Sequence, residues 1–458
     1  MDPANGLNPK GGIPLSLLSE YNAKKKTVPE LLSLLQDGDY ILSAQALAEP
    51  VTLLEQLPLL RQWGRKNIVF NSCMPFRDLA WYHDPAMQET LEHVCWFFSA
   101  PTRKAHQEGL CSFLPGYSTN LVRKTFQRLR SEGRRPVLLA TASPMDEEGN
   151  FSLSISALFE REIIDNGAVV LLEVSSRYPR THGDTTLPLS AVTAFVETDR
   201  TVPEMPKTTL RPVDEAIGSR IAELIPDGST LQLGVGHIPD AVAIRLKDRK
   251  HLGIHSGMFS ESLMELIRCG AVDNSLKGFH EGETVTAFAA GSEKLYRFLH
   301  ENKDVLLKGG YYTNAPAIIA RNRNMVSLNT ALEIDLTGQC AAESMGFTQW
   351  SATGAQTETV EGAQLSPGGK SILALPSCYT ARGKEGEKVL RSKIVLSFKP
   401  GTIVSTSRND VDYVVTEYGT AWLRGLPLDK RARALIAIAH PSFREQLTAD
   451  AKKYGLIF

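Results

Sequence analysis

The sequence predicts an α/β protein made of two related open α/β domains with an active-site cleft between them. Three observations support this fold class. Short strands rich in branched and leucine side chains alternate with helical stretches along the whole chain. The chain has 458 residues, which is too long for a single hydrophobic core. The third observation is a pattern that occurs once in each half.

This internal repeat covers residues 29–50 and 219–239 and the helical stretch after each. Each copy runs helix, Asp-Gly turn, buried strand, small-residue loop, proline and helix. Ligands of open α/β sheets bind beyond the carboxyl ends of the strands. We therefore expect the repeated loops, residues 44–50 and 234–239, to face each other across one cleft.

The elements of each half follow from the periodicity of apolar residues. Strands are expected at residues 40–43, 67–71, 136–140, 169–174, 230–233, 371–375 and 403–406. Helices are expected at residues 28–36, 51–62, 213–225, 241–247, 261–269 and 430–439. The Gly-, Pro- and Asn-rich residues 1–14 are expected to be mobile. A proline-bearing connector then divides an N-terminal domain, 15–205, from a C-terminal domain, 206–458.

Composition excludes several classes of protein. Fifty Lys and Arg residues against 51 Asp and Glu leave a net charge of −1, so we expect neither nucleic acid nor a membrane as partner. The six cysteines show no CxxC pair and no metal-ligand spacing, which predicts reduced thiols and no metal site. We see no secretory signal and no apolar run long enough for a bilayer, so a cytoplasmic protein is expected.

The segment most informative about function is residues 231–240, Leu-Gln-Leu-Gly-Val-Gly-His-Ile-Pro-Asp. Gly234 and Gly236 follow a strand and precede a helix, where glycine lets backbone N–H groups approach an anion or an oxyanion. The third glycine of a dinucleotide-binding motif is absent. The next strand runs through residues 252–260, Leu-Gly-Ile-His-Ser-Gly-Met-Phe-Ser.

Further strings strengthen the interpretation. They lie at residues 143–153, 179–184, 335–339, 354–363, 368–377, 406–419 and 436–444. Together with the two strands above, they resemble the acetyl-CoA hydrolase/4-hydroxybutyrate CoA-transferase family, from about residue 28 to the C-terminus. The resemblance implies two CoA-transferase-type α/β domains, coenzyme A as a substrate, no permanently bound cofactor and a symmetric homo-oligomer, either a dimer or a tetramer.

The resemblance also implies a chemistry and exposes a departure from it. In the family a glutamate attacks the acyl-CoA thioester, forms an acyl-glutamyl anhydride and then a glutamyl-CoA thioester, which an acceptor carboxylate or water resolves. Here Gly257 stands in the position of that glutamate. His255, two residues earlier, and His237 are candidate bases near neutral pH, although most such histidines are structural.

Four interpretations of Gly257 remain open. Glu49, on the repeat-related loop of the first half, replaces the missing nucleophile, and Glu261 is a weaker candidate. Alternatively, Gly257 leaves room for the acceptor acid or water to attack directly. The other two interpretations are that the protein binds acyl-CoA without turnover and that the glycine is an engineered inactivating replacement. Among these we favour Glu49 as the nucleophile. Its competing structural role is that of a carboxylate at the start of a helix, where the helix dipole favours a negative charge.

The resemblance assigns a set of candidate oxyanion- and CoA-binding residues. These are Gly234, Gly236, Gly354, Gln356, Glu358, Gly362, Lys370 and Asn314. In segment 354–363 the family's second glycine is replaced by Ala355 and its aspartate by Glu358. The competing role for Asn314 is that of a helix cap. A second carboxylate on the substrate would need a cation, for which Arg103, Arg177 and Arg180 are candidates.

The sequence therefore predicts an acyl-CoA:carboxylate CoA-transferase for small acyl groups, with acyl-CoA hydrolysis as a further activity. The alternatives are an acyl-CoA-binding protein without transferase turnover and a plain acyl-CoA thioesterase. Which acyl chain and which acceptor acid it uses cannot be read from the sequence.

Overall fold

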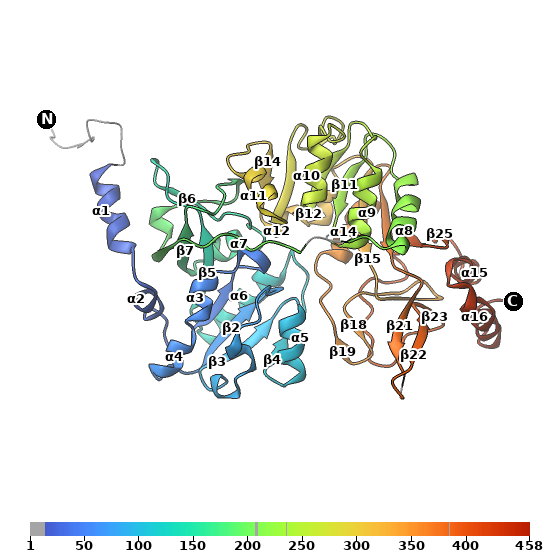
Figure 1. The fold of residues 1–458 in the computed structure, drawn as a ribbon, viewed down its shortest axis with the longest axis horizontal. Coiled ribbons are helices and arrows are strands. Elements are labelled where there is room, and N and C mark those ends of the chain that lie inside the picture. The colour runs from blue at the N-terminus through green and yellow to red at the C-terminus, as the bar shows by residue number, and fades with distance from the viewer. Residues whose placement is uncertain (1–13, 207–208, 235, 384) are drawn as a thin grey trace. The chain divides into compact units, whose positions relative to one another are not determined.

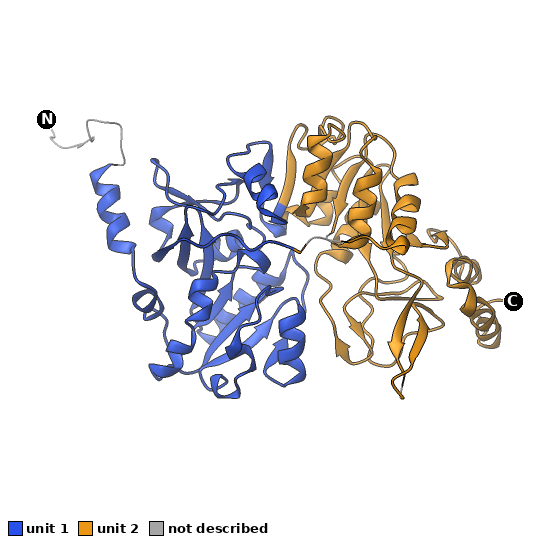
Figure 2. Cartoon of the chain, viewed as in Figure 1, with its two compact units in different colours: residues 1–205, 287–311 blue, residues 206–286, 312–458 orange. Residues whose placement is uncertain are grey.

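The computed structural model describes residues 14–206, 209–234, 236–383 and 385–458 (Figure 1). The chain forms two compact units (Figure 2). Unit 1 consists of Met1–Met205 and Ala287–Tyr311, and unit 2 of Pro206–Thr286 and Tyr312–Phe458. Most of the N-terminal segment expected to be mobile, residues 1–13, lies outside the described residues. The cleft expected between the two domains stays a prediction.

Unit 1 is built on a seven-stranded parallel sheet in the order β10-β7-β5-β1-β2-β3-β4. The strands are β1 (Tyr40–Ser43), β2 (Ile68–Ser72), β3 (Leu91–Cys95), β4 (Cys111–Phe113), β5 (Pro136–Ala142), β7 (Val169–Ser175) and β10 (Ala194–Thr198). Every residue of β1 and β2 is buried, as parallel strands covered on both faces require.

The helices of unit 1 are α1 (Leu15–Lys24), α2 (Val28–Leu32), α3 (Val51–Glu55), α4 (Pro58–Gln62), α5 (Ala100–Gln107), α6 (Leu121–Glu132), α7 (Glu160–Asp165) and α11 (Glu293–Leu299). A capping box between Thr27 and Glu30 starts α2. The single helix expected at 51–62 is divided in two, because Pro58 cannot donate the hydrogen bond that would continue α3. Short strands β6 (Asn150–Ser152), β8 (His182–Gly183), β9 (Thr186–Pro188) and β14 (Val305–Leu307) complete the unit.

The strands of unit 2 follow the order β25-β24-β20-β15-β11-β12. They are β11 (Thr230–Leu233), β12 (Gly253–Ser260), β15 (Met325–Thr330), β20 (Lys370–Ala374), β24 (Tyr413–Thr416) and β25 (Gly419–Trp422). All neighbouring pairs are parallel except β24 and β25. The carboxyl ends of β11, β15, β20 and β24 therefore lie at one edge. Strand β13 (Thr284–Ala290) begins in unit 2 and ends in unit 1.

Unit 2 also contains helices of 4 to 13 residues. They are α8 (Pro212–Glu223), α9 (His237–Arg245), α10 (Glu261–Arg268), α13 (Pro316–Ile319), α14 (Gln356–Leu365), α15 (Leu428–Ile438) and α16 (Pro441–Lys453); α12 (Gly310–Thr313) spans the boundary between the units. A hairpin, β21 (Cys378–Arg382) and β22 (Lys388–Ser392), projects from the sheet (Figure 1). The remaining short strands of unit 2 are β16 (Glu333–Asp335), β17 (Cys340–Ala341), β18 (Ser344–Met345), β19 (Thr348–Gln349) and β23 (Ile394–Val395).

These elements confirm the predicted α/β class and both copies of the repeat. The strand expected at 403–406 is wrong: this segment is irregular, with one isolated bridge from Thr406 to Cys340. None of the helices in the described part of the chain is long and apolar enough to cross a membrane.

Candidate functional site

One hollow of unit 2 lies at the carboxyl edge of its parallel strands. This pocket has a volume of about 910 Å³. Its lining follows β11 (Gly236, His237, Ile238, Pro239), β15 (Thr330, Ala331, Leu332), β20 (Ala374, Pro376) and β24 (Glu417, Tyr418). This is where ligands of open parallel sheets bind, because the loops that leave the strands there can diverge around a ligand. We call it the strand-end pocket.

The Gly-x-Gly loop contributes one wall of the strand-end pocket. Gly236 caps α9 with φ of 126° and ψ of −179°, a conformation open only to glycine. Gly234 is half-buried, and a Cβ atom there would meet nothing within 4 Å. The middle residue of the motif, Val235, lies outside the described residues. Gly236 and the first residues of α9 line the pocket, so this helix begins at the pocket wall.

Charged side chains of this pocket were missed by the sequence analysis. Lys393 lines it, and burial is the main cause that lowers the pKa of its ammonium group. Glu417 lines it as well, and its carboxylate accepts hydrogen bonds from the backbone N–H (2.9 Å) and the hydroxyl (2.6 Å) of Ser377. Glu417 directly follows the β-branched run that forms β24, which was an available signal. No sequence signal marks Lys393.

Gly257 lies in β12, where its neighbours on either side are buried and it is half-buried. The side chain of Asn314 occupies the adjacent space. A Cβ atom at position 257 would lie 2.7 Å from Asn314 Oδ1 and 3.4 Å from its Nδ2. The glycine is therefore packed against a buried carboxamide, and a larger side chain at 257 requires Asn314 to move.

His255, also in β12, is buried and neutral. Desolvation lowers its pKa to about 3, and the nearby charge of Lys277 acts in the same direction. Its Nε2 lies 2.8 Å from the carbonyl oxygen of Thr313 and donates to it, so Nδ1 carries the lone pair. The described part of the chain offers Nδ1 no hydrogen-bond partner. His255 is thus a weak base that fixes the turn before Asn314.

The segment around α14 holds four of the candidate CoA-binding residues. Gly354 has a φ of +57° just before the helix. The amide of Gln356 donates to the carbonyl of Thr330 at 3.0 Å, and Glu358 is buried in the first turn. A Cβ atom at Gly362 would lie 2.6 Å from the Cβ of Ile319. Gly362 therefore allows α13 and α14 to pack closely.

Lys370 lies at the first residue of β20, which is the amino end of the strand. Its Nζ donates to the carbonyl of Leu224 at 2.8 Å, just after α8. The structure does not bring Lys370 to the edge that carries Gly236 and the strand-end pocket.

In unit 1, Glu49 follows the first copy of the repeated loop. Its side chain is 3% exposed, and Oε2 accepts a hydrogen bond from the backbone N–H of Phe76 at 3.0 Å. Desolvation by burial raises the pKa of Glu49 to about 8. Oε1 has no hydrogen-bond partner among the described residues. At neutral pH this is therefore mainly an uncharged carboxylic acid with one oxygen available.

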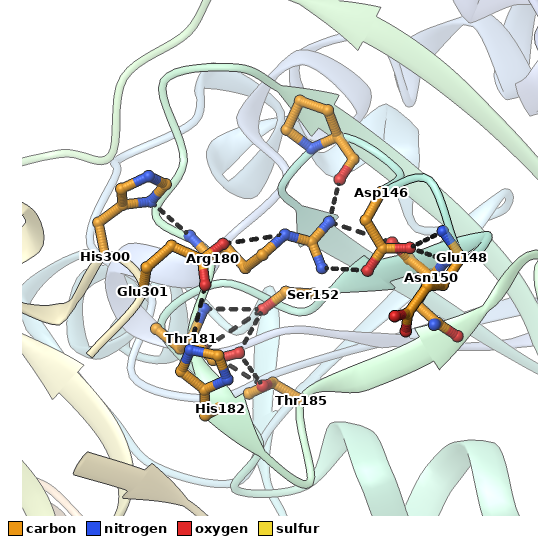
Figure 3. A network of polar contacts seen from close by, with 11 residues as sticks. Asp146, Glu148, Asn150, Ser152, Arg180, Thr181, His182, Thr185, His300 and Glu301 are labelled. Carbon is orange, nitrogen blue, oxygen red and sulfur yellow. Dashed lines mark hydrogen bonds and ion pairs between the residues drawn. The ribbon is translucent and has the colours of Figure 1, made fainter. Parts of the chain in front are cut away.

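Two of the segments singled out in the sequence, residues 143–153 and 179–184, meet at Arg180 (Figure 3). Its guanidinium donates to Asp146 Oδ2 at 3.0 Å and to the carbonyls of Asn150 and Pro144. Glu301 Oε1 lies 3.7 Å from its Nε. These contacts join segments 143–153 and 179–184, so Arg180 has a structural role and is not available to a substrate carboxylate. Arg177 lies elsewhere, lining a smaller pocket of about 450 Å³ in unit 1.

Comparisons with known proteins agree with this arrangement. Residues 16–206 match the acetyl-CoA hydrolase/transferase N-terminal domain, and residues 291–451 match the corresponding C-terminal domain. The chain is 37% identical to succinyl-CoA:cyclohexane-1-carboxylate CoA transferase of Geobacter metallireducens, over 96% of this chain and 97% of that protein. It is 38% identical to 4-hydroxybutyrate coenzyme A transferase of Clostridium kluyveri, over 94% and 98%.

A solved structure extends the comparison to the fold. The crystal structure of RipA from Yersinia pestis has a TM-score of 0.87 and 33% identity, covering 96% of this chain and all of that one (100%). The fold and the matches define an enzyme of the CoA-transferase class. The chain belongs to the acetyl-CoA hydrolase/transferase family.

Proposed function

We propose that this enzyme moves coenzyme A between a small acyl-CoA and a carboxylate acceptor, and hydrolyses the acyl-CoA when water takes the acceptor's place. The observation that carries the proposal is family membership over nearly the whole chain, with relatives named as CoA transferases. A pocket at the carboxyl edge of unit 2, large enough for part of such a substrate, supports it.

We propose Glu49 as the attacking group. Its carboxylate would attack the thioester carbon, release CoA thiolate and leave an acyl-glutamyl anhydride. The thiolate would then displace the donor acid and form a glutamyl-CoA thioester, from which the acceptor carboxylate takes up CoA by the reverse steps. Only the ionised form of Glu49 can attack, so its raised pKa makes the reaction depend on pH.

The packing at Gly257 favours a second route in which the acceptor acid itself attacks the thioester. The half-buried glycine offers no side chain that could attack, and the carboxamide of Asn314 beside it presents polar atoms to the same position. An acceptor carboxylate held there would form an anhydride with the donor acyl group, and the released CoA thiolate would attack the acceptor's carbonyl. This route needs no covalent enzyme intermediate.

One experiment separates these routes. The enzyme is mixed with an excess of acyl-CoA over acceptor acid labelled with ¹⁸O in both carboxylate oxygens, for a single turnover. Direct attack places label in the released donor acid at once, whereas attack by Glu49 places it in the glutamate. Borohydride trapping and peptide mass mapping then locate any acylated residue.

Thiol release from a panel of acyl-CoA esters, with and without acceptor acids, tests the function itself. Acceptor-dependent transfer supports it. Release that needs no acceptor identifies a thioesterase, and tight binding with no release identifies a binding protein. Either of the last two results would overturn the proposed transfer.

We also propose that the enzyme acts without a permanently bound cofactor, in the cytoplasm, as a homodimer or homotetramer, with domains at residues 15–205 and 206–458. The described residues contain no group of three His, Cys, Asp or Glu side chains placed to hold a metal ion. Metal analysis of the purified enzyme tests the absence of a metal cofactor, and light scattering tests the oligomeric state.

A further inference from the structure

Segment 75–83 of unit 1 follows β2, ends with the 3₁₀ helix Ala80–His83 and holds the carboxyl group of Glu49. The backbone N–H of Phe76 donates to Glu49 Oε2 at 3.0 Å, and the backbone of Arg77 forms a second hydrogen bond to the same carboxyl group. Hydrogen bonds of this kind favour the ionised carboxylate, so they lower the pKa of Glu49 against the larger effect of burial. The contacts that hold this segment in place therefore also affect the pKa of the acid.

Helix α5 fastens segment 75–83 at both of its ends. At the amino end of the helix, the hydroxyl of Ser99 donates to the carbonyl of Pro75 at 2.6 Å. At the other end, Glu108 caps the last turn, and its carboxylate contacts Nδ1 of His83. The 3₁₀ helix that carries this histidine packs against α5. The backbone groups that contact the buried acid thus lie between two anchors on one helix.

The second anchor requires a positively charged imidazole ring. His83 Nε2 lies 2.6 Å from Asp78 Oδ1, and its Nδ1 contacts Glu108. A neutral imidazole has a single N–H group, so one ring nitrogen would turn its lone pair toward a carboxylate oxygen. Only the imidazolium donates to both acids at once. The carboxyl end of α5 is also the end at which a helix dipole favours a cation.

The surroundings of His83 keep this charge in place. Burial lowers the pKa of His83, but the hydrogen bonds and charges of Glu108 and Asp78 outweigh it, so the pKa is raised above its ordinary value. In β3, His93 is neutral, because burial lowers its own pKa to about 3, and it adds no competing charge. The other titratable groups beside His83 in the chain or in the last turn of α5 are Asp84, which caps the following 3₁₀ helix, Lys104 and His106.

We propose that the charged His83 is a positioning residue, which clasps segment 75–83 onto α5 and so keeps two backbone hydrogen bonds on Glu49. The inference rests on the proposed function for the catalytic role of Glu49. The clasp opens when the ring loses its proton, because a neutral ring can donate to only one of its two carboxylates. The clasp therefore contributes its full stability below the ordinary pKa of 6.5 and loses it as pH rises through the raised folded-state pKa.

Hydrogen exchange of the full-length enzyme, followed by peptide mass spectrometry, measures the clasp without reference to catalysis. The variants are His83→Gln, which cannot carry a charge, and His83→Arg, which stays charged. At pH 6 the amides of residues 75–83 should exchange at least about tenfold faster in His83→Gln than in wild type, since a charged contact is lost. His83→Arg should keep the wild-type protection. Equal protection of the segment in His83→Gln and wild type overturns the inference.

The pH dependence of this exchange is a second readout. After correction for the intrinsic exchange rate, protection of residues 75–83 should fall in wild type as the pH rises through the raised pKa of His83. It should stay constant in His83→Arg over the same range. A parallel fall in both proteins overturns the pH-sensitive part of the inference.

The pH profile of kcat/KM for CoA transfer separates positioning from general damage to the fold. Without its backbone hydrogen bonds Glu49 ionises less readily, so the rising limb of the profile should move to higher pH in His83→Gln. We expect kcat/KM to be about tenfold below wild type at pH 6 and to converge on it above about pH 9, where Glu49 is ionised in both proteins. A uniform loss across the whole pH range overturns the positioning role.

Two further variants keep the test decisive. Glu108→Gln changes a side chain that is 38% exposed, and it should loosen segment 75–83 in the same way, because glutamine cannot pair with the imidazolium. The matched control is His251→Gln, since His251 pairs with Asp273 at 2.8 Å on the surface of unit 2. This control should leave both the exchange of the segment and the pH profile unchanged. A similar change in the control overturns the inference, because the loss of any histidine–acid pair would then suffice.

The outcomes distinguish this inference from the proposed function. A clasp that responds in hydrogen exchange, in an enzyme that transfers no CoA, supports the clasp and overturns the proposed function. Normal transfer together with equal exchange in wild type, His83→Gln and Glu108→Gln overturns the clasp and leaves the proposed function standing. Faster exchange in His83→Gln with an unmoved pH profile overturns the positioning of Glu49.

Discussion

The two copies of the repeated motif place opposite kinds of chemistry at the carboxyl ends of their strands. After β1, in unit 1, the loop is fully buried and ends in Glu49, an acid that desolvation keeps protonated at neutral pH. After β11, in unit 2, the loop opens into a pocket of about 910 Å³ next to Lys393 and two helix N-termini. The repeated strand-loop-helix motif can thus carry either a buried acid shielded from water or the wall of a polar pocket. Which of the two it carries depends on the residues that pack beside the loop.

The unit 1 loop also carries backbone strain that the unit 2 loop does not repeat in the same form. Ala46 and Met74, on the loops after β1 and β2, both have φ of 50°. In unit 2 the corresponding positive φ falls on a glycine, Gly236, where it costs little. Strain at non-glycine residues persists where surrounding contacts enforce it, and such positions gather at functional sites.

Replacing Glu49 gives the largest expected effect and tests the reactive side of the comparison. Glu49→Gln keeps the size of the side chain but cannot form an anhydride, so we expect turnover to fall by about a thousandfold or more. Asp39→Asn is the control: Asp39 is equally buried in unit 1, at the amino end of β1, and pairs with Arg135. Turnover of Glu49→Gln within twofold of wild type would remove Glu49 from the mechanism.

The pH dependence of catalysis and of stability also tests the role of Glu49. Since Glu49 must ionise to attack, kcat/KM should rise with pH and level off above about 8. Stability should show the opposite trend: a folded-state pKa above the unfolded value contributes stability at low pH that is lost as pH rises from about 4.5 to about 8. Denaturant unfolding of wild type and Glu49→Gln across this range measures it, and parallel curves for the two proteins would contradict it.

Sequence reasoning predicted the fold well because it depends on patterns spread over many residues. Strands at 40–43 and 230–233 were predicted with their observed bounds, since buried parallel strands are short apolar runs between clear turns. The site was harder, because only the chain topology brings Lys393 and Glu417 to the same pocket. No pattern in the sequence indicates that the residues after β20, β22 and β24 line the same pocket.

A smaller effect is expected at Gly257, where a substitution tests whether β12 has room for any side chain beside Asn314. Gly257→Ala brings a Cβ within 2.7 Å of Asn314 Oδ1, and we expect overpacking to cost about 1–3 kcal/mol. The cost should fall when Asn314→Gly is added, which a double-mutant cycle of denaturant unfolding measures. Gly234→Ala serves as the control, because its Cβ meets nothing within 4 Å. Additive effects of the two changes would contradict the contact.

Gly257→Glu tests the same contact through activity. If the missing carboxylate limits turnover, the double variant Gly257→Glu/Asn314→Gly should transfer CoA faster than Gly257→Glu alone, because only the double variant has space for the new side chain. Borohydride trapping should then map to position 257. Equal rates for the two variants would show that Asn314 does not restrict the site.

Lys277, a buried cation next to β12, contrasts with the acid in unit 1. Its stem passes Gly253, where a Cβ would lie 2.3 Å from Lys277 Cγ, and its Nζ donates to the carbonyl of Ile254 at 2.9 Å. Desolvation lowers its pKa to about 7. The folded protein then binds fewer protons than the unfolded chain between about pH 7 and 10.5, so stability should rise with pH in that window. Lys277→Met should remove this slope in pH-dependent unfolding, and an unchanged slope would contradict it.

Lys370 gives the smallest expected effect and tests which edge of the unit 2 sheet binds coenzyme A. The resemblance to CoA-transferases makes it a candidate ligand, but its Nζ donates to the carbonyl of Leu224 at the amino end of β20. Lys370→Met should lose this one hydrogen bond and about 1 kcal/mol of stability, while CoA affinity stays within twofold of wild type. Calorimetric titration of Lys370→Met and Lys393→Met with CoA compares the two lysines directly. A loss of CoA affinity in Lys370→Met but not in Lys393→Met would move the binding surface away from the carboxyl edge, because one lysine lies at each end of the same parallel strands.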